Sequence, residues 1–205
     1  SARDTFAMLK EKGIYLERKP FSMGLRIEHL QKDIDDVQYR AYAGTPNLGA
    51  ADYKLAFTRP GERGVYTFCM CPGGKVVAAA PETETVVTNG MSNYRRDEEN
   101  ANSAVLVSIL PSDFAGDDVL AGIQLQRKLE RDAYLLGGSD YSAPVQTVGD
   151  FLADRCSTGL GKVRPSYTGS VKLANLREIL PPYISRALAE GIPALGRKLR
   201  GFDAP

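Results

Sequence analysis

The chain has 205 residues, of which 43% are hydrophobic and 25% are charged, as in average folded globular domains. This composition excludes extensive disorder, a collagen-like repeat and a coiled coil. The 26 basic residues nearly balance the 25 acidic ones, so net charge creates no attraction to nucleic acid or to an anionic membrane.

Targeting signals and cysteine content indicate the cellular location of the protein. No apolar stretch approaches the roughly 20 residues that span a bilayer, and residues 1–6 form no apolar signal-peptide core. Three cysteines, an odd number, do not make a disulfide framework. We therefore expect a cytoplasmic protein with reduced thiols, and no membrane or nucleic-acid partner.

The predicted elements begin with a helix over residues 2–12, opened by a Ser1–Asp4 cap. A strand follows over residues 21–29, where apolar and polar positions partly alternate. Residues 30–40 then predict a short helix, and residues 44–49 a loop.

The central third is expected to hold short strands separated by Gly, Pro and Asn turn residues. The predicted strands cover residues 53–58, 64–69, 75–79, 85–88 and 104–110. The Asn89-Gly90 pair is typical of a tight hairpin, but residues 91–93 do not continue as a strand. Residues 95–102 form a charged, amide-rich stretch between two of these strands.

The last third is mainly helical. It predicts helices over residues 119–136, 148–155 and 182–199, with a Gly-, Pro- and Ser-rich loop over residues 159–169. The fold class is therefore α+β, with a mainly antiparallel central sheet and flanking N- and C-terminal helices. We expect one domain over residues 1–205, excised from a longer protein; deliberate trimming of the chain is the alternative.

A Cys69-Met70-Cys71 pair stands where an apolar strand meets Pro72-Gly73-Gly74. Alternation along an extended strand sends both sulfurs to one face. A zinc site would need two further ligands, and only His29 and Cys156 remain. A thiol–disulfide couple lacks the C-x-x-C spacing. The pair is interpreted either as small buried residues or as part of a ligand site, because glycine lets a backbone approach a ligand closely.

A second polar segment, Asn89-Gly90-Met91-Ser92, is followed by Arg95. It combines an amide, a glycine and a hydroxyl, which suits either contact with a planar polar ligand or a surface turn. His29 is the single histidine, and we expect a solvated or helix-capping side chain there. Gly159-Leu160-Gly161 lacks the third glycine and the preceding strand of a dinucleotide-binding loop, so the chain has no such unit of its own.

Several short segments occur in an order that resembles one family. The two most specific are Phe68–Gly74 (FCMCPGG) and Asn89–Ser92 (NGMS). The others include Lys19–Phe21, Arg26–His29, Tyr53–Leu55, Asn100–Asn102, Gly137–Gly138, Ala143–Pro144, Asp150–Leu152 and Ser166–Tyr167. Together they resemble the middle domain of the bacterial FAD-dependent dehydrogenases, over essentially the whole chain.

This resemblance implies an inserted cap domain on the substrate side of a larger oxidoreductase. The FAD-binding, Rossmann-like segments of the parent would lie outside the chain, so the chain alone would not retain FAD. Its partners would be the parent's own FAD-binding domain and a small-molecule substrate. The exposed cap face could also associate with itself.

The resemblance also implies the site residues. Those expected to contact the isoalloxazine ring are Met70, Cys71, Pro72, Gly73, Gly74, Asn89, Gly90, Met91 and Ser92. Backbone N–H groups there could stabilise negative charge on the reduced ring. Arg26 and Arg95 are candidates for holding an anionic substrate.

Two other hypotheses remain open from the sequence. An autonomous thiol redox or small-molecule-binding protein would use the Cys69-Met70-Cys71 motif. An interaction module would use the edge formed by residues 68–74 to contact another protein.

Overall fold

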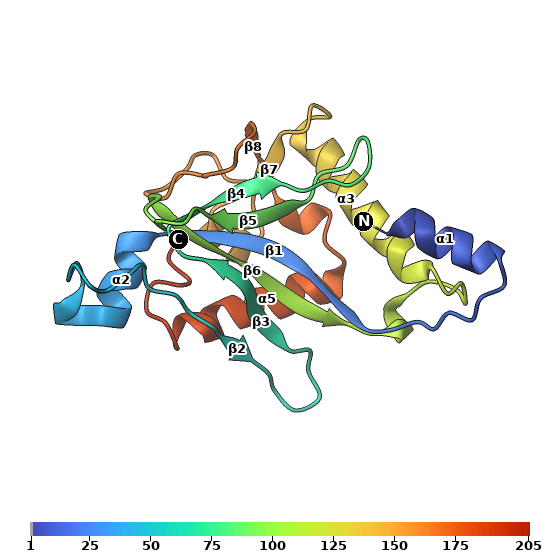
Figure 1. Cartoon of the computed structure of the whole chain (residues 1–205), viewed down its shortest axis with the longest axis horizontal. Coiled ribbons are helices and arrows are strands. Elements are labelled where there is room, and N and C mark those ends of the chain that lie inside the picture. Colours follow the sequence, from blue (N-terminus) through green and yellow to red (C-terminus); the bar gives the residue numbers. More distant parts are fainter. Residues whose placement is uncertain (1) are drawn as a thin grey trace.

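A four-stranded antiparallel sheet with strand order β1-β6-β3-β2 forms the centre of the molecule (Figure 1). In the computed structural model, which describes residues 2–205, these strands are β1 (Phe21–Leu30), β2 (Ala56–Phe57), β3 (Val65–Cys71) and β6 (Asn100–Ile109). The longest pairing joins β1 to β6, from Phe21 opposite Ile109 to Leu30 opposite Asn100. This antiparallel sheet with its helices confirms the predicted α+β class.

The two faces of the sheet have different roles. One face carries buried apolar side chains such as Met23, Val65 and Val107, which belong to the same core cluster as helix α5 (Pro182–Gly196). Gly191 allows this close packing, because a Cβ there would lie 2.6 Å from a methyl group of Val65. The core therefore sits between the sheet and α5.

The opposite face carries Arg26, Asn102 and Leu106, and smaller elements lie over it (Figure 1). Strands β4 (Gly74–Ala78) and β5 (Thr88–Ser92) form an antiparallel two-stranded sheet there. Helix α3 (Ala121–Gly137) and the parallel pair β7 (Ala143–Val145) and β8 (Val171–Leu173) lie beside it. The remaining elements are α2 (Gln31–Tyr39), α4 (Val148–Leu152), η1 (Arg40–Tyr42), η2 (Pro111–Asp113) and η3 (Leu176–Glu178).

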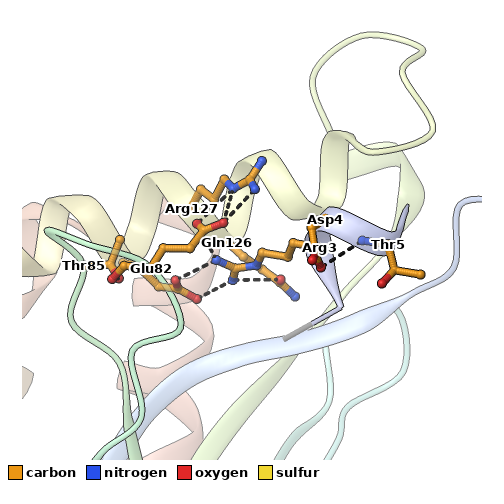
Figure 2. Close-up of polar contacts among 8 residues, drawn as sticks. Arg3, Asp4, Thr5, Glu82, Thr85, Gln126 and Arg127 are labelled. Atoms are coloured by element: carbon orange, nitrogen blue, oxygen red, sulfur yellow. Dashed lines mark hydrogen bonds and ion pairs between the residues drawn. The ribbon is translucent and has the colours of Figure 1, made fainter. Parts of the chain in front are cut away.

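Helix α1 (Arg3–Glu11) buries none of its residues and is attached to the rest of the protein by ion pairs. Figure 2 shows the Arg3 guanidinium reaching α3 and the loop that carries Glu82. Arg3 lies 2.6 Å from a Glu130 carboxylate oxygen and 3.0 Å from one of Glu82. Arg127 also pairs with Glu82. Ser1, which was expected to cap this helix, lies outside the described residues.

Most predicted elements are confirmed within a few residues, and three predictions are wrong. The strand expected at residues 85–88 lies instead at β5, so Asn89-Gly90 is part of a strand and not a turn. The strand expected at 53–58 is reduced to the two residues of β2. The last central strand was expected over residues 104–110, but β6 begins at Asn100, within the charged and amide-rich stretch of residues 95–102. β7 and β8 were not predicted. No helix of residues 2–205 is long and apolar enough to cross a membrane.

The expectation of a solvated or capping His29 is also wrong. Its side chain is 7% exposed, and Nε2 lies 3.0 Å from the backbone oxygen of Phe202. The rings of Tyr53 and Phe202 pack against it. His29 occupies the core-facing alternation of β1, on the same side as Met23, and this position decides its burial. Burial lowers the pKa of His29, so the imidazole is neutral and Nε2 donates to Phe202.

This burial predicts a pH-dependent stability. Because the folded state binds the His29 proton less tightly than the unfolded state, the free energy of unfolding should fall as pH drops below the unfolded pKa of about 6.5. The slope should reach up to about 1.4 kcal/mol per pH unit. Urea denaturation of the wild type and of His29→Gln between pH 5 and 8 measures it. Equal slopes for the two proteins would show that His29 does not titrate on unfolding.

Candidate functional site

The structure brings the two specific segments of the sequence together. Residues 70–74 run from the end of β3 into β4, and residues 89–92 belong to β5, which pairs with β4. Gly74 lies opposite Ser92 in this ladder. The Ser92 hydroxyl also donates a hydrogen bond of 2.6 Å to the Pro72 carbonyl. The two segments therefore form one structural unit.

The Cys69-Met70-Cys71 motif forms a bulge in β3. The pairing with β6 shifts register between Phe68 and Cys71, and Cys69 has a φ of +48°, in the left-handed region. Cys69 is exposed and Cys71 is buried, and neither forms a disulfide. The bulge interrupts the regular alternation that would have placed the two sulfurs on one face. Burial raises the pKa of the Cys71 thiol, which reduces its nucleophilicity at neutral pH.

The two glycines after the bulge allow the chain to pack against itself. Gly73 has a φ of +45°, and a Cβ there would collide with the backbone carbonyl of Arg96. Its N–H donates 2.7 Å to the side-chain oxygen of Gln31. A Cβ on Gly74 would lie 2.8 Å from the Ser92 hydroxyl. Pro72, Gly73 and Gly74 are buried by these neighbours, so the half-exposed and exposed candidates are Met70, Asn89, Gly90, Met91 and Ser92.

Arg26 reaches this bulge from β1. One guanidinium nitrogen donates 2.6 Å to the Asn102 side-chain oxygen, and the other donates 3.2 Å to that of Asn89. Gly90 leaves room for the guanidinium, because a Cβ there would collide with it and with Asn102, and would lie 2.8 Å from the Cys71 sulfur. The predicted residues Arg26, Cys71, Asn89 and Gly90 are therefore in contact.

The positive charge of Arg26 has no counter-ion within residues 2–205. Burial lowers the pKa of Arg26. By contrast, the hydrogen bonds that Arg3 and Arg63 donate to carboxylates raise the pKa of these two arginines. The guanidinium stays ionised, so a half-buried cation is held only by neutral oxygen atoms. Such an arrangement is complementary to an anionic group brought from outside.

Large apolar side chains are exposed on the neighbouring strands. Phe68, on the bulged strand, is 61% exposed, and Met91, on β5, is 62% exposed. Phe68 was not predicted as a site residue, although it opens the FCMCPGG segment. Asn102 was also missed; the alternation of β6 could have placed it on the Arg26 face. Arg95 is exposed in the turn after β5, and no hydrogen bond within the described chain joins it to the other candidates.

Comparison with known proteins now adds the family. Residues 20–205 match the family model described as "FAD-dependent protein, C-terminal domain-like". The chain belongs to this family. A relative from Clostridium beijerinckii, described as an uncharacterized protein, is 49% identical over 203 residues. The alignment covers 98% of this chain but 38% of that relative, so the chain spans well under half of its length. The chain is thus a domain of the kind found in FAD-dependent proteins.

The close approach of Arg26 and Asn102 to Gly90 predicts that a side chain at this position destabilises the protein. Gly90→Ala should destabilise the protein by about 1–3 kcal/mol, because the new methyl group must displace Asn102 and Arg26. Gly49→Ala is the matched control, since no atom lies within 4 Å of its Cβ position. Chemical denaturation measures both. Two variants of equal stability would show that the Gly90 contact is relieved without cost.

The unequal burial of the thiols predicts unequal reactivity. With iodoacetamide at pH 7.5 under native conditions, Cys69 should be labelled several times faster than Cys71, whose thiol is buried and has a raised pKa. Peptide mass spectrometry over time gives both rates, with exposed Cys156 as an internal reference. Fast labelling of Cys71 would favour the thiol redox hypothesis.

Proposed function

We propose that this chain is the cap domain of an FAD-dependent oxidoreductase, a dehydrogenase, which covers the flavin ring and shapes the substrate pocket. In this proposal it is inserted between segments of a flavin-binding domain in a cytoplasmic protein and has no turnover by itself. The family match supports the link to FAD. The description of that family leaves the position of the flavin-binding segments open.

The single observation that carries the proposal is the Arg26 cation, which has no carboxylate partner, on a strand near those that expose Phe68 and Met91. An isoalloxazine ring has two apolar faces and a polar edge that accepts hydrogen bonds. Apolar side chains near a guanidinium without a carboxylate partner fit that combination. Several expected backbone contacts fit less well, since the Gly73 N–H is already bonded to Gln31.

Each residue then has a defined role. When bound, the flavin supplies the redox chemistry. Phe68 and Met91 would exclude water from the ring, and Asn89 would orient both Arg26 and the ring edge. Arg26 would hold positive charge where the ring becomes negative, a role that the sequence had suggested for backbone N–H groups. Arg95 stays a proposed contact for an anionic substrate.

The phosphates of FAD have no evident binding site in this chain, because the sequence has no glycine-rich phosphate-binding loop. The phosphates would therefore be held by the flavin-binding domain, which is the proposed partner of the exposed face. In isolation, the same apolar face could associate with a second copy.

The proposal predicts the flavin content of the isolated chain and of the longer protein, and the effect of Arg26 on the flavin potential. The 205-residue chain alone should purify without flavin absorbance, and the longer protein that contains it should purify yellow. In the longer protein, Arg26→Gln should lower the two-electron flavin potential by about 30–60 mV, a 10- to 100-fold loss of preference for the reduced form. Dithionite titration with reference dyes measures the potential.

Arg186→Gln provides the matched control, because Arg186 is an exposed arginine on α5, behind the opposite face of the sheet. Its potential should equal that of the wild type. Stoichiometric FAD in the isolated chain would contradict the cap assignment. An unchanged potential in Arg26→Gln, with the fold intact, would remove Arg26 from the ring.

A further inference from the structure

A cavity of about 420 Å³ lies behind β5, on the side away from Met91. Its floor is the Arg26 face of the sheet, and its walls come from β4, α3 and β7. Small and apolar side chains dominate the lining, among them Val76, Ala104, Leu106, Leu129, Ala133 and Val145. The volume falls within the range of small-molecule sites.

The two carboxylates in the cavity wall accept hydrogen bonds from the protein. Glu28 accepts hydrogen bonds from the Ser166 N–H at 3.1 Å and from the Asn100 side chain at 3.0 Å. Glu130 pairs with Arg3. The Arg26 guanidinium, which also lines the cavity, donates to the side-chain oxygen atoms of Asn102 and Asn89, and its buried Nε has no hydrogen-bond partner among residues 2–205. The charges of Glu28 and Glu130 are balanced by Arg26 and by Arg3, which pairs with Glu130, so the wall carries no net charge that would attract an anion or a cation.

The wall also carries a tyrosine hydroxyl without a hydrogen-bond partner in the described chain. Tyr167 lines the cavity, and no group within residues 2–205 forms a hydrogen bond to its hydroxyl. By contrast, the hydroxyl of Tyr66 donates to Ser22, another lining residue. Burial raises the pKa of Tyr167, so its phenol is a protonated donor at neutral pH.

The backbone around Tyr167 is held on both sides. The Val76 N–H donates 3.0 Å to the Ser166 hydroxyl, and the Thr168 N–H donates 3.1 Å to the Val76 carbonyl. Gly169 has no side chain to push the ring away, since a Cβ there would lie 2.8 Å from it. The backbone that carries Tyr167 is thus held in place before any ligand binds, which lowers the entropic cost of binding.

We propose that this cavity binds an uncharged molecule with an apolar body and one carbonyl oxygen, which accepts a hydrogen bond from the Tyr167 hydroxyl. Under the proposed function, on which this assignment of role rests, that molecule is the substrate class of the enzyme. The binding site itself does not depend on flavin. Thr88 and Asn89 are neighbours on β5, so the cavity adjoins the face proposed to meet the ring.

Three matched probes test the proposal on the 205-residue chain by NMR titration: 1-tetralone, tetralin, which lacks the oxygen, and 2-naphthoate, which is charged. We expect tetralone to bind most tightly and naphthoate least. Tyr167→Phe should raise the Kd of tetralone about 3- to 10-fold and leave that of tetralin unchanged. Tyr42→Phe, which removes an exposed hydroxyl outside the cavity, should change neither.

A second variant tests the location. Ala133→Leu should fill the cavity and abolish binding of both neutral probes, whereas Ala115→Leu, at an exposed loop position, should not. The proposal is overturned if no probe binds the wild type or if naphthoate binds as tightly as tetralone. It is also overturned if Tyr167→Phe leaves the Kd of tetralone unchanged. Tetralone binding without any Arg26 effect on the flavin potential would overturn the proposed function alone.

Discussion

The pairing of β1 with β6 is the constraint on which the rest of the structure depends. It extends over both ten-residue strands and assigns each side chain of β1 to one of two compartments. Met23, Ile27 and His29 face the core beneath α5, and Arg26 faces the bulge. A slip of one residue would exchange the two sets, placing a guanidinium in the core and an imidazole at the surface. The register that buries the core face therefore also fixes the position of Arg26 on the opposite face.

Strand β5 separates two environments on the Arg26 side of the central sheet. On its outer side lie Asn89 and Met91 with the bulged motif, and on its inner side lies the apolar cavity. The two sides differ in polarity: the outer side carries the exposed Asn89 and Met91, whereas apolar side chains dominate the cavity lining and Arg26 lies beneath the strand at Gly90. Such a division suits the proposed contact with a planar ring on one side and with an uncharged molecule on the other. Gly90 is central to it, because its missing side chain lets Arg26 pass beneath the strand.

Periodicity predicted the long elements, because their apolar positions repeat at 3.6 or 2 residues and decide which side is buried. β1, α3 and α5 follow that rule. β5 does not, since its glycine, amide and hydroxyl are favoured in turns, and only its pairing with β4 and its contact with Arg26 make it a strand. The site shows the same limit. Its two segments were identified from a family resemblance, but the bulge at Cys69, the burial of Gly73 and the Asn102 contact depend on tertiary packing that no local pattern contains.

The position of Phe202 links the core to the order in which the chain is made. This side chain is fully buried, its carbonyl accepts from His29, and it belongs to the same cluster as Met23. The sheet-facing core is therefore incomplete until almost all of the 205 residues have been synthesised. During translation, β1 must wait for β6 and then for the last turn after α5, with its apolar face uncovered. Slow closure of such distant contacts is the stage at which chaperones act and at which aggregation competes with folding.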